Sequence, residues 1–450
     1  MKRREIDMLQ GPILPAIIRY TIPIIITSVL QMLFTAADLM VVGWFCGSRS
    51  VAAVGATTSI TYLFINFFVG LSGGAGVTVA HSIGSGNDTA IRNTVHTAML
   101  TAFAGGTFLT VLGWFASQPM LKFMGTPEEI LPLSAVYMKV YFLGMIFNMV
   151  YNFSASILRA SGDTQSPLYY LLFSGVFNVL LNLVFVVGFG MDVAGVALAT
   201  IIAESISAIL CVWKLMKRSD ACQLKLNKLR IDYSQLMKIL RIGVPAGLQA
   251  SLFSISNVSI QSAINSFGEA FVAGNSAATS IEGFMYVTVN SFQQTAVNFV
   301  GQNYGAGQYD RARKVTRTCF ASVIVTGIVL SWTILAVCKP LLGLYIDDSA
   351  EAIAFGMIRF AVCNPIYFMI GLQDVITGVL RGYGHSAAPM IISVLGICGI
   401  RLAWINTIFR LPQFHTPHYL YLIFPISWTV TFVCQMIYYG KMIRKNQFSL

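Results

Sequence analysis

Four acidic side chains lie inside long apolar stretches of the sequence, where a carboxyl group is costly. They are Asp38, Glu204, Glu282 and Asp374, whereas the other 14 of the 18 acids fall in or near polar segments. A carboxylate within hydrocarbon costs on the order of 2.5–3.5 kcal/mol on insertion scales, so such a group tends to be protonated, paired or bound to a cation. The chemistry that these residues could perform is reversible cation binding. The alternative is a buried carboxyl group that neighbouring helices satisfy.

Polar residues at helical spacing accompany two of these acids. Thr200 and Glu204 are four residues apart, as are Asn178 and Asn182, so each pair lies on one face of a helix. We predict that both pairs join Asp38 in a polar pocket in the first half of the chain, and that this pocket binds a coupling cation. A hydrogen bond that only packs two helices together is an equally open interpretation for each amide.

The second half carries a different set of polar groups within its apolar stretches. Glu282 and Asp374 are its acids, and Arg401 is a cation deep in an apolar stretch. We expect Arg401 to pair with an acid such as Asp374, because charges inside a membrane are usually paired.

The elements that must position these residues are membrane-spanning helices. The chain is 56% hydrophobic and only 10% charged, with a mean hydropathy of +0.71, whereas a soluble domain carries about 25% charged residues. Runs of about 18 or more apolar residues indicate spanning helices. We predict an all-α polytopic membrane protein with twelve spans, at residues 15–41, 51–80, 93–116, 132–158, 166–188, 193–215, 237–265, 272–300, 315–337, 354–380, 387–409 and 418–440.

The formal charge of +11 follows the predicted topology. Numbering the loops alternately places 22 of the 29 Lys and Arg residues on one side of the membrane. This asymmetry obeys the positive-inside rule and predicts that both termini are cytoplasmic. We therefore expect the protein to lie in the lipid bilayer and expect its basic residues to bind no nucleic acid. The eight cysteines form no CxxC or Cys/His pattern, which predicts no metal centre and no redox cofactor.

The chain repeats itself at about half its length. The segment LRASGDTQSP (158–167) returns as LRGYGHSAAP (380–389), and Arg19 and Pro23 return as Arg241 and Pro245, all 222 residues apart. Each unit holds six spans, an even number, so the halves enter the membrane in the same orientation as parallel repeats. We predict a six-helix lobe at 1–218, a cytoplasmic linker at 219–236 and a second six-helix lobe at 237–450.

The repeated motif predicts scaffold and hinge residues. Arg159 and Arg381 fall where spans four and ten leave the membrane, Gly162 and Gly384 permit a tight turn, and Pro23 is a candidate hinge in span one. The glycine-rich pieces at 70–76 and 305–313 lack the GxxxxGK[ST] pattern of a phosphate loop. We expect them to allow close helix packing.

The sequence resembles the prokaryotic branch of the multidrug and toxic compound extrusion (MATE) transporters. The resemblance covers nearly the whole chain and is carried by the doubled LRxxG motif and by the segments at 21–43, 81–87, 178–182 and 301–313. It implies two six-helix lobes that form a V around a central cavity. It also implies efflux of organic cations driven by entry of H⁺ or Na⁺, in the bacterial inner or plasma membrane. We expect a monomer without a cofactor.

The family's site residues map onto this chain with departures. Its coupling acid in span one falls on Asp38, its span-five pair on Asn178 and Asn182, and its span-six polar position on Thr200. Asn182 stands where one branch of the family has an aspartate. Phe253 stands where sodium-coupled members have a glutamate, and Glu204 stands where glutamine is frequent. The resemblance leaves open that Glu204 takes the place of the missing carboxylate.

The sequence predicts one function, leaves one alternative function open and argues against an enzyme. We expect a secondary antiporter that exports lipophilic, amphipathic or cationic drugs and toxic organic compounds by alternating access. The alternative is a lipid-linked oligosaccharide flippase of related architecture, which would be expected to line its cavity with several Arg or Lys residues. An enzyme is not expected, because the sequence has no HExxH motif and its five histidines fall near the ends of spans.

Overall fold

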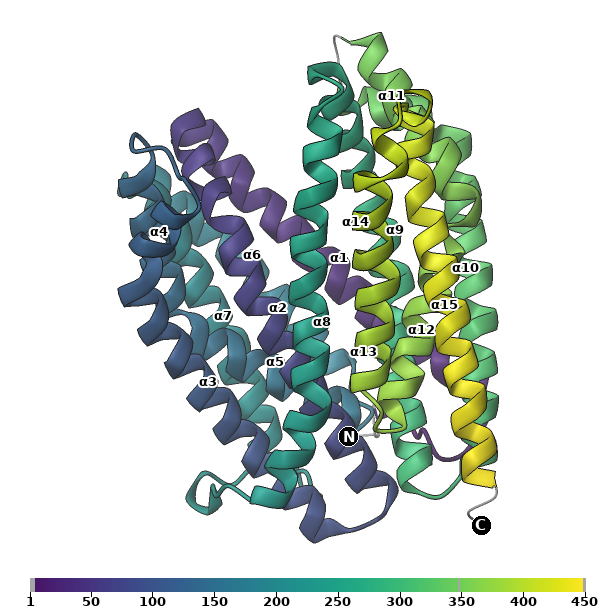
Figure 1. The fold of residues 1–450 in the computed structure, drawn as a ribbon. Helices are drawn as coiled ribbons and strands as arrows, with labels where there is room; N and C mark the ends of the chain where they lie inside the picture. The colour runs from purple at the N-terminus through teal and green to yellow at the C-terminus, as the bar shows by residue number, and fades with distance from the viewer. Residues whose placement is uncertain (1–4, 347–348, 448–450) are drawn as a thin grey trace. The chain divides into compact units, whose positions relative to one another are not determined.

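The computed structural model describes residues 5–346 and 349–447, and every regular element in these ranges is helical. Figure 1 shows long helices that run side by side within each part of the chain. The helices of the first half are α1 (Ile13–Phe45), α2 (Ser48–Gly84), α3 (Asp88–Phe123), α4 (Leu131–Leu143), α5 (Met145–Ala160), α6 (Gln165–Asn182) with the π-helical η1 (Leu183–Gly188), and α7 (Asp192–Met216).

The second half follows a short 3₁₀ turn, η2 (Leu226–Lys228), and has the same order of long and broken helices. Its elements are α8 (Tyr233–Asn265), α9 (Glu269–Gly305), α10 (Tyr309–Gly343), α11 (Ala350–Cys363), η3 (Asn364–Ile366), α12 (Phe368–Gly382), α13 (Ala387–Ser393), the π-helical η4 (Val394–Gly399), α14 (Ile400–Asn406), η5 (Ile408–Arg410), η6 (Pro412–Phe414) and α15 (Pro417–Gln447).

Nine of the twelve predicted spans lie within one continuous helical segment, and the other three (132–158, 354–380 and 387–409) cross a break between helices. The all-α polytopic fold is confirmed. In the described residues, nine helices are long and apolar enough to cross a membrane, and counting two bent helix pairs as one span each gives up to eleven. The helix that corresponds to the predicted span 272–300 is α9, which is not among these because it is more polar. With 37 residues it is nevertheless about 55 Å long, ample for a bilayer.

The internal repeat is visible in the positions of the breaks. The axes of α4 and α5 differ by 46° across Gly144. Those of the segment Ala350–Ile366, which comprises α11 and η3, and of α12 differ by 51° across Tyr367. Tyr367 lies 223 positions after Gly144, within one residue of the offset of the sequence motifs. Neither bend was predicted, although Gly144 stands at the first break and Asn364 and Pro365 directly precede the second.

The repeated LRxxG motif forms the same turn twice. Gly162 N–H donates to the carbonyl of Arg159 (3.0 Å), and Gly384 N–H donates to the carbonyl of Arg381 (2.8 Å). Both glycines have positive φ, +93° and +84°, the left-handed conformation that glycine adopts without a Cβ penalty. The predicted tight turns are therefore confirmed.

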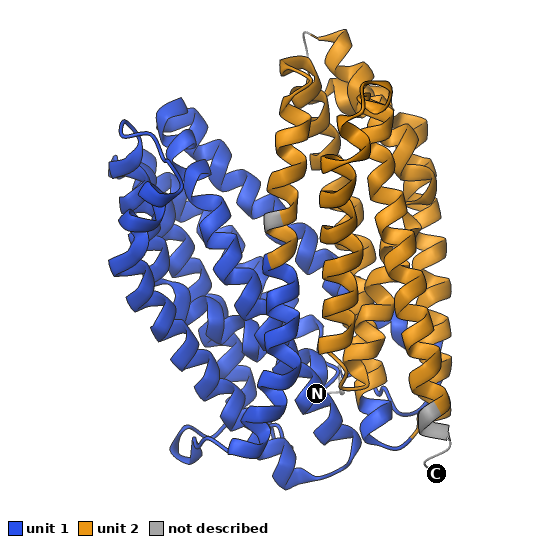
Figure 2. Ribbon diagram, in the orientation of Figure 1, with its two compact units in different colours: residues 1–251, 302–307 blue, residues 252–301, 308–450 orange. Residues whose placement is uncertain are grey.

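The described residues divide into two units by proximity of their Cα atoms, coloured in Figure 2. Unit 1 comprises residues 1–251 and 302–307, and unit 2 comprises 252–301 and 308–450. The division falls within α8, and the last residues of α9 belong to unit 1. The predicted boundaries at 219–236 stay a prediction.

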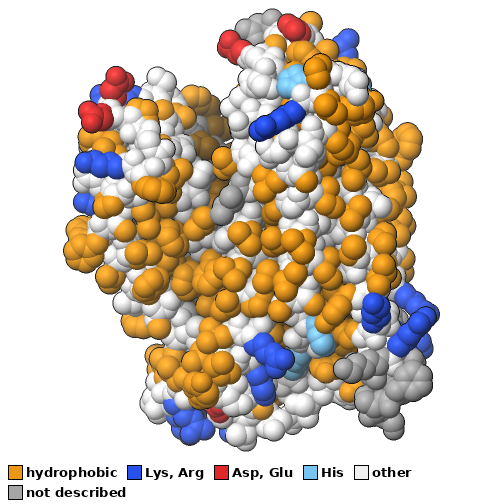
Figure 3. Space-filling model, in the orientation of Figure 1, with side chains coloured by type: hydrophobic (Ala, Val, Ile, Leu, Met, Phe, Trp, Pro, Cys, Tyr) orange, Lys and Arg blue, Asp and Glu red, His pale blue; other side chains and the backbone are white. Residues whose placement is uncertain are grey.

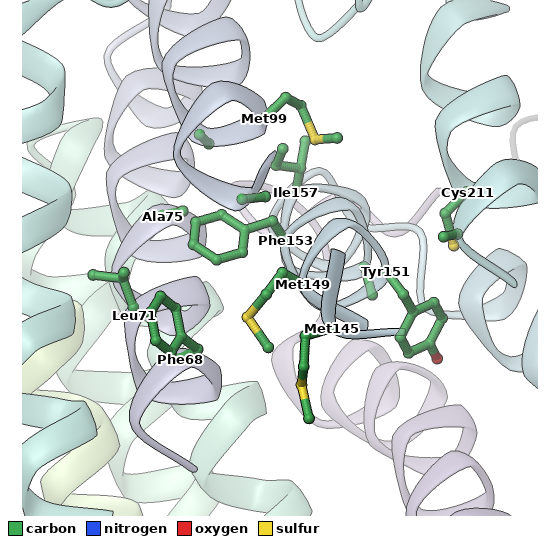
Figure 4. Close-up of a cluster of buried hydrophobic side chains, with 14 of the residues drawn as sticks. Phe68, Leu71, Ala75, Met99, Met145, Met149, Tyr151, Phe153, Ile157 and Cys211 are labelled. Carbon is green, nitrogen blue, oxygen red and sulfur yellow. The ribbon is translucent and has the colours of Figure 1, made fainter. Parts of the chain in front are cut away.

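Several sulfur-containing and aromatic side chains pack among the aliphatic ones in the core of unit 1. Met145, Met149 and Phe153 of α5 are fully buried and lie with Phe68 and Leu71 of α2 (Figure 4). Flexible thioethers fill the irregular gaps beside aromatic rings. This packing holds α5 firmly inside unit 1 and thereby fixes the polar side chains on its other face.

Small residues allow helices of unit 1 to touch backbone to backbone. A Cβ added to Gly70 or Gly74 of α2 would lie 2.3 or 2.5 Å from atoms of Gly247 or of Gly243 and Ile239 on α8. At the C-terminal end of α2, a Cβ on Gly84 would lie 2.1 Å from the carbonyl oxygen of Gln302, and a Cβ on Gly305 would lie 2.3 Å from that of His81. The two glycine-rich pieces therefore serve close helix packing, as predicted.

The surface matches a membrane environment. On the face shown in Figure 3, hydrophobic side chains cover the middle of each unit, and Lys, Arg, Asp and Glu lie near the ends. Large apolar side chains such as Phe108, Phe115 and Trp332 are more than half exposed. Such exposure is expected of helices that face lipid.

Candidate functional site

Asp38 is held by side chains from two other helices of unit 1. Asn182 of α6 donates from Nδ2 to Oδ1 of Asp38 at 2.6 Å, and Thr200 of α7 lies with its Oγ1 3.3 Å from Oδ2. Asn178 Nδ2 donates to Thr200 Oγ1 at 3.4 Å, which closes the network. The structure thus brings Asp38, Asn178, Asn182 and Thr200 together.

The local helix geometry explains how the two amides reach Asp38. Asn178 and Asn182 are one turn apart on the same face of α6, and both are buried, at 4% and 0% exposed. The α-helix ends at Asn182 and continues as the π-helical η1, a distortion that is frequent at functional sites. The Oδ1 atom of Asn182 is buried and has no hydrogen-bond partner among the described residues.

Glu204 lies one turn beyond Thr200 on α7 and has its own amide partner. Asn148 of α5 donates from Nδ2 to Oε1 of Glu204 at 2.8 Å. Asn152, one turn further along α5, donates to the backbone carbonyl and to Oδ1 of Asn148, at 2.9 and 3.0 Å. These bonds orient the Asn148 amide so that its N–H faces the carboxylate.

Both carboxylates line one cavity within unit 1, with a volume of about 280 Å³. Asp38, Asn178, Thr200 and Glu204 are among its lining residues, and Asn182 joins them through its bond to Asp38. Tyrosine side chains form much of the remaining wall, namely Tyr62, Tyr137, Tyr141 and Tyr151. The five residues predicted to share a polar pocket therefore do so, while their role in coupling stays a prediction.

The cavity is lined by two acidic side chains and by no basic one. Its lining contains no Lys or Arg, and the ion pairs of residues 5–346 and 349–447 include neither Asp38 nor Glu204. The same residues contain no group of three or more His, Cys, Asp or Glu side chains that could hold a metal ion. The site is thus suited to a monovalent cation or to a proton.

The acids of unit 2 occupy two separate environments. Arg359 of α11 binds Glu282 of α9 through Nε and Nη2, both to Oε2, at 3.0 and 2.6 Å, and donates from Nη1 to Asn275 at 2.8 Å. Asp374 of α12 accepts from Nδ2 of Asn290 at 2.9 Å. Glu282 therefore has a fixed cationic partner.

The predicted pairing of Arg401 with Asp374 is wrong. Arg401 of α14 donates from Nε to the hydroxyl of Ser427 at 3.1 Å, and its guanidinium lies 4.6 Å from the ring centroid of Phe424. A hydroxyl and an aromatic face supply favourable contacts for a buried guanidinium. Among the described residues of unit 2, a buried arginine that does pair with an acid is Arg359.

Three contributors to these sites were missed by sequence analysis. Asn148 and Tyr151 lie on α5, and Arg359 lies on α11. The spacing of Asn148 and Asn152 repeats that of Asn178 and Asn182 and could have indicated a second amide ladder. A tyrosine in an apolar run gives no comparable signal.

The predicted hinge and scaffold residues lie at helix ends or inside α1. Pro23 is buried within α1, and its carbonyl accepts from the hydroxyl of Thr27 at 2.7 Å. The carbonyl of Arg159 accepts from the hydroxyl of Tyr20 at 2.7 Å, and Arg381 lies in the last turn of α12. A hinge role for any of them stays a prediction.

Comparison with known proteins agrees with this architecture. The profile of the MatE family matches residues 23–184 and 245–405, one segment in each half of the chain. The chain therefore belongs to the MatE family, the MATE transporters that its motifs resemble.

Two curated relatives and a solved structure show the extent of the similarity. The chain is 27% identical over 391 residues to the Probable multidrug resistance protein YoeA of Bacillus subtilis, covering 85% of this chain and 84% of that protein. It is 26% identical over 391 residues to the Probable multidrug resistance protein NorM of Thermotoga maritima, with 86% and 83% covered. A structure described as the outward-facing conformation of a multidrug resistance MATE family transporter of the MOP superfamily superimposes with a TM-score of 0.89 at 20% identity, and all of both chains is covered. The fold is shared.

Proposed function

We propose that this protein is a secondary antiporter that exports lipophilic or cationic organic compounds in exchange for H⁺ or Na⁺. The observation that carries the proposal is the cavity of unit 1, in which Asp38 is bonded by side chains of α6 and α7 and faces no basic residue. The printed names of the relatives, which describe multidrug resistance proteins, support drugs as the substrate class.

The hydrogen bonds of Asp38 indicate how it can exchange a proton. Its Oδ1 accepts from an amide N–H, which cannot become an acceptor, whereas its Oδ2 lies beside a hydroxyl. Thr200 also donates to the carbonyl of Val196 at 2.9 Å, so its oxygen is free to accept from a protonated Oδ2. A proton therefore binds at Oδ2 without breaking the bond to Asn182.

A sodium ion would use the same oxygens. Carboxylate, amide and hydroxyl oxygens are the ligands that hard cations prefer. The buried Oδ1 of Asn182 and both oxygens of Asp38 offer such ligands. Either ion neutralises Asp38 and removes its attraction for a cationic substrate in the same cavity.

The proposal also covers the oligomeric state, the membrane orientation, the coupling residues and the alternative flippase function. The transporter acts as a monomer without a cofactor in the bacterial cell membrane, with both termini in the cytoplasm, as the basic loops predict. Asp38, Asn178, Asn182, Thr200 and Glu204 are the cation-coupling residues of this cavity, and the halves alternate in access as parallel repeats. A cavity without Lys or Arg in its lining does not favour the phosphates of a lipid-linked oligosaccharide, so the flippase is the weaker alternative.

The test is transport of a fluorescent lipophilic cation by purified protein in proteoliposomes. Wild type should exchange the dye when a proton gradient or a sodium gradient is imposed separately, and Asp38→Asn should not. Asp88→Asn is the matched control, because Asp88 is exposed in the first turn of α3. Undiminished transport by Asp38→Asn would overturn the assignment of the coupling residue.

A further inference from the structure

The cavity of unit 1 contains a second carboxylate whose surroundings differ from those of Asp38. Asp38 is bonded by Asn182 and Thr200, whereas Glu204 is bonded by Asn148. The two acids share no hydrogen-bond partner among the bonds that these side chains make. Each is therefore equipped to hold its own cation.

The two carboxylates are arranged in sequence along α7. Thr200, which contacts Asp38, and Glu204 are four residues apart, so they lie on one face about 6 Å from each other along the helix axis. Glu204 is the nearer of the two to Lys214, at the basic end of α7. A cation that leaves Asp38 toward that end would meet Glu204 next.

An unpartnered polar atom marks the second site. The hydroxyl of Tyr151 is buried and has no hydrogen-bond partner among the described residues, and Tyr151 lines the same cavity as Glu204. The side chain is only 6% exposed, and Figure 4 shows its hydroxyl pointing away from the labelled methionine and phenylalanine side chains of the core. A buried hydroxyl without a partner is costly. The hydroxyl oxygen of Tyr151 would gain a partner by coordinating a cation bound at Glu204.

Other titratable groups of the cavity leave the charge of Glu204 uncompensated. They are Asp38 and four tyrosines, which are neutral at physiological pH in their ordinary state. The Asn148 amide presents its N–H to Oε1, which supports the ionised form, and no arginine or lysine competes for Glu204 among the cavity's lining residues. Glu204 thus differs from Glu282, whose Arg359 partner already satisfies the charge.

We propose that Glu204, Asn148 and Tyr151 form a second monovalent-cation site, distinct from the Asp38 site, so that each transport cycle exchanges two cations. The proposal rests on the antiport function proposed above and adds the number of ions to it. The two candidate ions, H⁺ and Na⁺, have the same charge and are distinguished by the experiment.

Ion binding to purified full-length protein in detergent tests the site without any drug. Bound ²²Na⁺ is measured by equilibrium dialysis, and bound protons by acid–base titration in sodium-free buffer. Wild type should bind two ions of one kind, or one of each. Glu204→Gln and Asp38→Asn should each bind one fewer, and their combination should bind neither. Glu128→Gln, an exposed acid in the loop before α4, is the matched control and should bind as wild type does.

Transport in proteoliposomes tests the consequence for charge movement. Exchange of two cations for one monovalent organic cation moves net charge, so an imposed membrane potential should change the rate of wild type and of Glu128→Gln. Glu204→Gln should still transport, but independently of the potential. Retention of the wild-type potential dependence and of both bound ions by Glu204→Gln would overturn the proposal.

A milder variant tests the second site even if Glu204→Gln does not fold. Tyr151→Phe removes only the unpartnered hydroxyl and should lower the affinity of the second ion roughly three- to tenfold, leaving the first unchanged. Unchanged affinity for both ions would count against the site. If wild type moves no drug under either gradient, the antiport function fails, whereas the ion count still decides for or against the Glu204 site.

Discussion

Arg359 forms an ion pair with Glu282, with 2.6 Å between Nη2 and Oε2, and each side chain is only 8% exposed. The guanidinium also lies 5.0 Å from the ring centroid of Phe424 and donates to Asn275. A buried ion pair of this kind fixes α11 against α9, because removal of one partner leaves the charge of the other buried, unpaired and without hydration.

Removal of one partner should therefore destabilise unit 2. We expect Arg359→Met or Glu282→Leu alone to cost about 3–5 kcal/mol, and the double variant to recover most of this loss. The measurement is the midpoint of thermal unfolding in detergent. The exposed pair of Arg313 and Asp310 is the control, since its loss should cost less than about 1 kcal/mol. A double variant as unstable as the sum of the single ones would contradict the explanation.

The crossing of α2 and the end of α9 should tolerate no side chain at Gly84. A Cβ there would lie 2.1 Å from the carbonyl oxygen of Gln302, which is backbone and cannot rotate away. Gly84→Ala should cost about 1–3 kcal/mol through overpacking. Gly55→Ala in the same helix meets nothing within 4 Å and should leave the unfolding midpoint unchanged or raise it. Equal midpoints for both variants would refute the role of this contact.

The two donors of Asp38 should contribute unequally to transport. Asn182 lies 2.6 Å from Oδ1, whereas Thr200 lies 3.3 Å from Oδ2 and also bonds Val196. A hydrogen bond to a charged group is worth about 1.5–3 kcal/mol. Asn182→Leu should thus reduce gradient-driven dye exchange by roughly tenfold or more, and Thr200→Val by less. The check is the initial rate per folded transporter, and the reverse ranking would contradict it.

The connection between α7 and α8 should loosen in acid. Asp232 precedes α8 and accepts from the backbone N–H of Gln235 (3.2 Å) and from Nδ2 of Asn93 (2.7 Å). The Gln235 N–H, followed by the Asn93 amide, lowers the pKa of Asp232 below its ordinary 3.8. Because the pKa is lower in the folded protein, the stabilisation is complete above pH 4 and is lost as the pH falls through the folded-state pKa.

Hydrogen exchange of residues 217–236 provides the measurement for this prediction. Exchange should increase as the pH, after correction for intrinsic rates, drops below about 4. Asp232→Ala should produce the increase already at neutral pH, with a loss of about 1 kcal/mol typical of a helix cap. Asp310→Ala, at the exposed start of α10, should leave this segment unaffected. Pronounced protection in Asp232→Ala at neutral pH would disprove the anchoring role.

The features that depend on local pattern could be predicted from the sequence. Hydropathy located nine of the twelve spans within one continuous helical segment, and the 222-residue offset identified the repeat. The spacing of Asn178 and Asn182 placed both amides on the face that meets Asp38. Contacts between distant helices could not be predicted, because hydropathy says nothing about which helices are neighbours. For that reason Arg401 was assigned the wrong partner, and Asn148 and Arg359 were overlooked. The bends at Gly144 and Tyr367 were overlooked as well, because mean hydropathy stays high across both breaks and does not register a single Gly144 or Pro365.

The division of the chain within α8, together with the return of residues 302–307 to unit 1, has a consequence for dissecting the protein. A gene cut at the 219–236 segment would deprive the first fragment of the start of α8, with its Gly243 and Gly247, and of the end of α9 that covers Gly84. The severed halves should fold only when synthesised together, each acting as the missing scaffold of the other.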